Sequence, residues 1–190
     1  NNAVISKLKT YEKPTIVFGA LSKELATKEN SEFKPKNYIS ITTSQSYTED
    51  LELLQQLANP QTVGVIVEKA FTDNLPIKAT FEAIGAELNM EIQLISFESL
   101  TDIASNLENI DAVYLAGGFY LTNEELRQLA DVFIERKLPS FTANPVKDVK
   151  TGILATNHNQ SELNQFFRRI ALTVESIVNG NSLTSSSTTL

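Results

Sequence analysis

Apolar and polar residues along the chain follow two different periods. Seven short runs rich in β-branched and aromatic residues are separated by longer segments in which apolar residues recur at helical spacing. The predicted strands cover residues 15–19, 38–42, 62–68, 91–97, 112–116, 140–142 and 152–155. Strands that alternate with helices are typical of parallel sheets, so the pattern predicts an α/β fold with helices on the sheet faces.

Helix boundaries carry their own signals. Ser46 and Thr122 each precede a glutamate by three residues, a spacing that predicts capping boxes at the starts of two helices. A final helix is expected over residues 161–178, stopped by Gly180. Its helical spacing predicts five inward side chains: Phe166, Phe167, Ile170, Val174 and Ile177.

The polar turn at residues 58–60 predicts a boundary between two lobes. Residues 1–60 form a partial N-terminal lobe in this scheme, residues 61–142 a second α/β lobe, and residues 143–180 a return segment with the terminal helix. The first lobe holds two predicted strands, fewer than a stable sheet usually has, and we expect its remaining strands to lie upstream. Residues 181–190 are mostly Ser and Thr and are expected to form a flexible tail.

Composition narrows the classes of function. The chain has 23 acidic and 16 basic residues and a net charge of −7, which argues against binding to nucleic acid phosphates. No run approaches the roughly 18 apolar residues that a membrane-spanning helix needs. The sequence has no cysteine, which is compatible with a periplasm or a cytosol, and any signal peptide would lie outside it.

Several segments, in order along the chain, resemble motifs of one family. Residues 14–20 resemble its strand PIVFAAV, residues 62–67 its TVGVLY, residues 111–115 its DAIYV and residues 171–180 its AGEMAVKILKG. The family is that of the ABC transporter substrate-binding proteins with the type I periplasmic-binding fold, in the group with tryptophan- and tyrosine-type binding components. The resemblance spans residues 14–180 as an ordered set of weak motifs.

This resemblance implies a two-lobed receptor with an incomplete N-terminal lobe, because the family has further βα units before the first motif. It implies capture of a small molecule between the lobes, with an amino acid as the first expectation, and a membrane permease as partner. A periplasmic or other extracytoplasmic location follows. Neither catalysis, a cofactor nor a metal is expected. Residues 116–120 replace the family's PTDN turn, so the ligand differs or binds more weakly.

Ligand-binding residues are expected where parallel strands end and helices begin. Aromatic rings could stack on a planar ligand, glycine permits close backbone approach, and amides offer donors and an acceptor. Ordinary turn and core roles explain the same residue types. The candidates are Ser22, Ser44, Phe71, Thr72, Gly118, Phe119, Tyr120, Asn144 and Asn157.

Two other readings stay open. A sensory or receptor domain could keep this fold without a transport role. Residues 111–119 also resemble the DAIxxxGGF turn of amidotransferase-like hydrolases, but the sequence has no cysteine and no Gly-x-Ser-x-Gly elbow. The single histidine, His158, has no partner visible in the sequence and is given no role.

Overall fold

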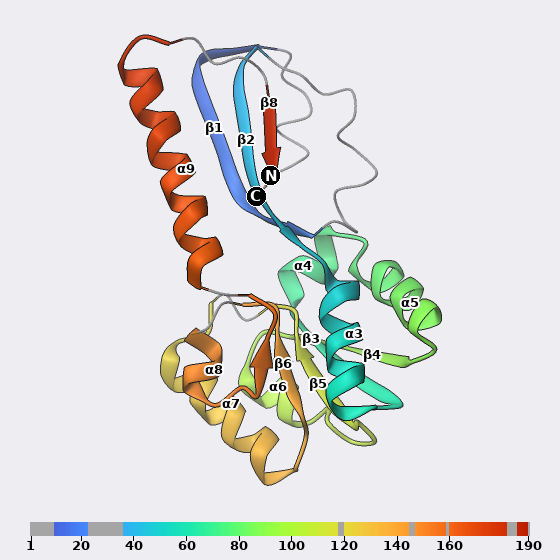
Figure 1. The fold of residues 1–190 in the computed structure, drawn as a ribbon. Helices are drawn as coiled ribbons and strands as arrows, with labels where there is room; N and C mark the ends of the chain where they lie inside the picture. The colour runs from blue at the N-terminus through green and yellow to red at the C-terminus, as the bar shows by residue number, and fades with distance from the viewer. Residues whose placement is uncertain are drawn as a thin grey trace. The chain divides into compact units, whose positions relative to one another are not determined.

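The structure is a computed structural model that describes residues 10–22, 36–117, 120–144, 147–158, 160–181 and 186–189. Contacts divide the chain into two compact units (Figure 1). Unit 1 combines Asn1–Gln45 with Ser161–Leu190, and unit 2 is the continuous segment Ser46–Gln160.

Unit 2 is built on a five-stranded sheet in which every described pair of strands is parallel. Its strands, in spatial order, are β4 (Glu91–Phe97), β3 (Thr62–Glu68), β5 (Ala112–Leu115), β6 (Ser140–Thr142) and β7 (Ala155–Thr156). β3, β4 and β6 have the bounds that the sequence predicts. The predicted α/β class with parallel sheets and flanking helices is therefore confirmed.

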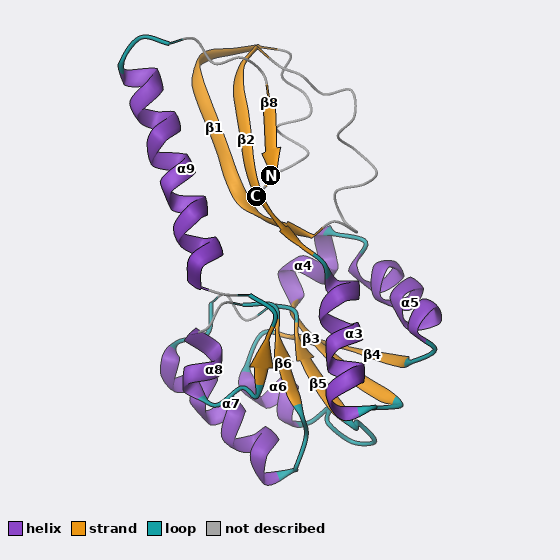
Figure 2. Cartoon of the chain, viewed as in Figure 1, coloured by secondary structure: helices purple, strands orange, loops and turns teal. Residues whose placement is uncertain are grey.

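Helices cover both faces of this sheet (Figure 2). On one face, the fully buried ring of Tyr114 in β5 lies 6.2 Å from that of Phe81 and 6.2 Å from that of Tyr47, measured between ring centroids. These two rings come from α5 (Ile77–Leu88) and α3 (Tyr47–Ala58). A short helix, α4 (Lys69–Asn74), follows β3 directly.

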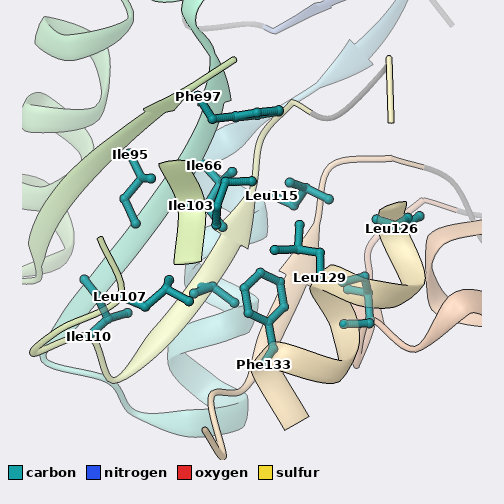
Figure 3. Close-up of a cluster of buried hydrophobic side chains, with 13 residues drawn as sticks. Ile66, Ile95, Phe97, Ile103, Leu107, Ile110, Leu115, Leu126, Leu129 and Phe133 are labelled. Atoms are coloured by element: carbon teal, nitrogen blue, oxygen red, sulfur yellow. The ribbon is translucent and has the colours of Figure 1, made fainter. Parts of the chain in front are cut away.

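The opposite face packs against α6 (Leu100–Ala104) and α7 (Asn123–Glu135), and α8 (Lys147–Thr151) lies against α7. Side chains from β3, β4, β5, α6 and α7 form a hydrophobic cluster there (Figure 3). Its labelled members are Ile66, Ile95, Phe97, Ile103, Leu107, Ile110, Leu115, Leu126, Leu129 and Phe133. The two apolar layers fix the sheet between helices, which leaves its strand ends as the places where polar groups gather.

Capping explains where the helices of unit 2 begin and end. Ser46 Oγ accepts a hydrogen bond from the Glu49 amide at the start of α3, and Thr122 and Glu125 form a complete capping box at the start of α7. α3 and α5 end at Asn59 and Asn89, both in the left-handed conformation that asparagine tolerates better than most residues. The capping box predicted at Thr122 is confirmed, and Ser46 begins its helix as an N-cap.

Unit 1 contains a parallel sheet in the order β1-β2-β8, with β1 (Thr10–Ser22), β2 (Lys36–Gln45) and β8 (Ser186–Thr189). α9 (Gln160–Val178) packs through Phe166 and Ile170 against Ile39 and Ile41 of β2. The stretch expected to be a flexible tail thus contains a strand, because residues 186–189 pair with β2 through their backbone, which composition alone does not reveal.

Two further expectations differ from the structure. The division between units falls between Gln45 and Ser46 and not near residue 60, because α3 buries Leu51 and Leu54 within unit 2. Residues 143–160 also belong to unit 2 and not to a return segment. In α9, Phe167 and Val174 are 55% and 45% exposed, so the inward face runs through Phe166, Ile170 and Thr173 instead.

None of the helices in the described segments has the length and apolar character needed to cross a membrane.

Candidate functional site

Buried polar side chains gather at one edge of the sheet in unit 2. The strands are parallel, so the residues at and just after their carboxyl ends share this edge, which we call the carboxyl edge. We call the polar residues linked there the edge network: Asp50, Glu68, Tyr114, Gly117, Thr142, Asn144, Asp148, Thr156 and His158.

Asn144 is the junction of this network. Its side-chain Nδ2 donates to the carbonyl of Gly117 at 2.9 Å, and its backbone amide donates to Thr142 Oγ1 at 3.0 Å. Its carbonyl accepts from Thr156 Oγ1 at 2.9 Å. These bonds join the ends of β5, β6 and β7, and the residue is buried, with 6% of its surface exposed. Such a buried, multiply bonded amide holds the three loops in one arrangement.

Asp148 extends the network toward α8. Thr142 Oγ1 donates to Asp148 Oδ2 at 2.9 Å, and both residues are buried. Burial raises the pKa of the Asp148 carboxyl, because the charged form loses its solvation, while hydrogen bonds from Thr142 and Asn144 partly oppose that rise. A carboxyl with a raised pKa therefore lies directly beside the junction.

Asp50 forms the second branch, from the first turn of α3. Its Oδ2 accepts a 2.7 Å hydrogen bond from the hydroxyl of Tyr114 and lies 3.8 Å from Nε2 of His158. The His158 amide in turn donates to Thr156 Oγ1 at 3.2 Å, which connects this branch to Asn144. The Asp50 side chain is completely buried. The histidine that had no partner in the sequence thus has an aspartate beside it.

Two of the buried acceptors on this edge, Oδ1 of Asp50 and Oδ1 of Asn144, accept no hydrogen bond from the described residues. A buried polar atom that makes no hydrogen bond costs about 1–3 kcal/mol, and more when the group is charged. Native structures tolerate few such atoms, so these two mark a place where a donor from outside the protein would be stabilising.

At Gly117, the turn after β5 lies close to the end of β3. A Cβ atom built on this glycine would collide with the carboxylate of Glu68, which ends β3 and is 6% exposed. Only glycine leaves the space that the Glu68 side chain fills at this point. The turn after β5 is therefore shaped around a buried carboxylate.

The structure places the predicted site residues in different environments. Asn144 lies within the edge network, whereas Asn157 and Tyr120 are exposed, Tyr120 by 81%. Phe71 and Thr72 lie half-buried in α4, where the Thr72 hydroxyl bonds the Lys69 carbonyl and the Ser96 hydroxyl. Their contact with a ligand stays a prediction.

The other predicted residues can be placed only in part. Ser22 and Ser44 lie in strands β1 and β2, and their side chains are outside the description. Gly118 and Phe119 lie outside the described residues.

Sequence reasoning missed most of the network. Asp50 sits in the first turn of a helix, where an acidic residue is ordinary, and Tyr114 has the pattern of a buried strand residue. Glu68 was counted as the last residue of a strand. A signal was present in Glu68 itself, a charge that closes an otherwise apolar strand at its carboxyl end.

In the segments that the structure describes, no group of three or more His, Asp or Glu side chains has the geometry to hold a metal ion.

Comparison with known proteins finds similarity at the level of the fold. No protein-family model and no curated protein matches the sequence. Among solved structures, it is similar to a conserved domain protein from Vibrio cholerae, with 16% identity and a TM-score of 0.64 over 81% of this chain and 53% of that one.

Two other similar structures belong to proteins whose binding role is described. A substrate-binding protein with adhesive properties from Clostridium difficile, in a ligand-free, open form, is 19% identical, with a TM-score of 0.58 over 82% of this chain and 54% of that one. An ABC domain in complex with L-Trp from Streptococcus pneumoniae is 16% identical, with a TM-score of 0.63 over 83% of this chain and 54% of that one.

These similarities show that the chain shares its fold with substrate-binding proteins, as the sequence motifs predicted. The chain spans about half the length of each of these structures.

Proposed function

We propose that the chain is the ligand-binding part of a substrate-binding protein, which captures a small molecule and releases it unchanged. The observation that carries the proposal is the edge network, a set of buried polar groups at the carboxyl edge of a parallel sheet, in which Oδ1 of Asp50 and Oδ1 of Asn144 accept no hydrogen bond from the described residues. Ligands of α/β proteins commonly bind at this edge. The fold shared with substrate-binding proteins supports the same role.

The finer parts of the proposal follow the sequence motifs. The protein would serve an ABC-type uptake system, outside the cytoplasm, and deliver its ligand to a membrane permease. An amino acid is the first ligand to test, because one protein with this fold was solved with L-Trp. Uptake of the identified ligand by cells with and without the protein would test the transport role.

A thermal-shift screen of the whole chain tests binding itself. Amino acids and other small metabolites are added at millimolar concentration, and a true ligand is expected to raise the melting temperature progressively with its concentration, since it binds only the folded state. Absence of any such rise across all classes of compound would contradict the proposal.

A pair of variants then tests the site. Asn144→Ala removes the junction of the edge network and is expected to weaken the binding of the compound found. Asn106→Ala makes the same change at an exposed position after α6, outside the candidate site, and is expected to bind as the parent does. Equal binding by both variants would place the ligand elsewhere.

A further inference from the structure

We infer that the carboxyl edge of unit 2 receives a ligand that carries a protonated amine, and that Asp50 is the charged partner of this amine. The inference rests on the proposed ligand-binding function and specifies the chemistry of the group that enters the site. It is carried by Asp50 and by the fixed orientation of the Asn144 amide.

The carboxylate of Asp50 is incompletely compensated. It is completely buried, and one of its oxygens accepts a hydrogen bond from Tyr114. Its other oxygen accepts none from the described residues, and the basic side chain within ion-pair distance is His158, at 3.8 Å and charged only when protonated. Buried charges in proteins are normally paired with an opposite charge. A cation beside the second oxygen would complete the compensation of this carboxylate.

The Asn144 side chain presents a second acceptor, and its orientation is determined by chemistry. Nδ2 donates to the Gly117 carbonyl, so exchanging the amide oxygen and nitrogen would set two acceptors against each other. Oδ1 must then be the atom without a partner, and it is buried as well. Both open groups on the edge thus require donors.

An ammonium group would supply both the positive charge for Asp50 and the donors for the two oxygens. It offers three N–H donors and one positive charge, and it has no acceptor that would conflict with the two oxygens. A ligand carboxylate is acceptor-only and would meet the buried carboxyls of Asp50, Glu68 and Asp148 along the same edge. A hydroxyl could donate to one of these oxygens but would bring no positive charge to Asp50. The observations favour an amine over either of these groups.

Matched probes separate these chemistries on the unmodified chain. One series is tryptamine, indole-3-propionate and tryptophol, and the other is pentane-1,5-diamine, glutarate and pentane-1,5-diol, each measured by isothermal titration calorimetry. We expect the amine of at least one series to bind about tenfold or more tightly than the acid and the alcohol of that series. This result needs no variant, so it does not depend on how a substitution folds.

Two variants assign the effect to Asp50. Asp50→Asn keeps an acceptor for Tyr114 but removes the charge, and it is expected to lose about tenfold or more in affinity for the bound amine. Asp73→Asn removes the same charge from an exposed residue of α4, which also follows a strand at this edge, and is expected to bind the amine as the parent does.

The possible results decide between the two proposals. An acid or alcohol that binds while its amine does not would overturn the inference and leave the proposed function standing. Binding of some other metabolite with no response to any amine would do the same, with solvent alone filling the open acceptors. Absence of binding by every compound in the wider thermal-shift screen would overturn both.

Discussion

The hydroxyl of Tyr114 donates a 2.7 Å hydrogen bond to Asp50, 64 residues earlier in the chain. The bond links the first turn of α3 to the central strand β5, and both residues are completely buried. It ties a helix to the sheet interior through two buried side chains. Removal of this hydrogen bond should therefore lower the stability of unit 2.

We expect Tyr114→Phe to lower the free energy of unfolding by about 1–3 kcal/mol, because it leaves a buried carboxylate oxygen without its donor. Urea unfolding measures the change. Tyr120→Phe is the matched control, since it deletes the same hydroxyl from a ring that is 81% exposed, and it should change stability by less than about 0.5 kcal/mol. Similar losses in both variants would show that the Tyr114 hydrogen bond does not stabilise the fold.

The buried carboxyl of Asp148 should make the stability of the fold depend on pH. Burial raises the pKa of this carboxyl, so the folded protein holds this proton to a higher pH than the unfolded chain does. The carboxyl therefore destabilises the fold above its folded pKa, and the penalty disappears once pH falls below the ordinary value for aspartate, about 3.9. We expect Asp148→Asn to be more stable than the parent at neutral pH, with the gap narrowing as pH falls toward that value.

Urea unfolding of both proteins at several pH values tests this. The amide oxygen of the variant can still accept from Thr142, so the comparison removes mainly the charge. Asp73→Asn serves as a control at an exposed ion pair and should show no such stabilisation. A variant less stable than the parent at every pH would mean that the carboxylate itself is favourable in place.

Gly117→Ala should displace the Glu68 carboxylate, because the new methyl group needs the same space. We expect a loss of stability on the order of 1–3 kcal/mol, typical of overpacking at a buried position. A double-mutant cycle checks the cause: in a Glu68→Ala background the added methyl group should cost clearly less. Equal costs in the two backgrounds would assign the effect to the backbone turn instead.

Neighbouring residues of α7 test the position of the hydrophobic cluster. Phe133 is 1% exposed and Ile134 is 62% exposed, although the two residues are adjacent in the sequence. Phe133→Ala should destabilise unit 2 by about 3–5 kcal/mol, since it leaves a cavity in the layer shown in Figure 3. Ile134→Ala should cost less than about 1 kcal/mol in the same unfolding assay. Comparable losses would mean that α7 is rotated from its described orientation.

Local patterns predicted much of the fold. β3, β4 and β6 have the expected bounds because short apolar runs between polar turns are strong strand signals, and Thr122 begins α7 through local hydrogen bonds. The boundary between the units was misplaced because it depends on where α3 buries Leu51 and Leu54, which the sequence does not state.

The candidate site was less predictable for the same reason. Asn144 was expected at a strand end, where the structure has it, because strand ends are visible in the pattern. Asp50, Tyr114 and His158 come from three distant parts of the chain. No local sequence pattern predicts the contacts among them. On α9, helical spacing predicted that Phe166 and Phe167 both face inward, but only Phe166 of these two is buried.

Unit 2 is one continuous stretch of chain, whereas unit 1 joins a segment before it to a segment after it. During synthesis on the ribosome, β1 and β2 therefore emerge before unit 2 but have no α9 to cover Ile39 and Ile41 until unit 2 has been made. Unit 2 emerges complete in the meantime and can fold as soon as residue 160 is released. β1 and β2 are thus made before unit 2 but reach their final structure after it, and their apolar residues depend on protection by a chaperone until α9 is complete.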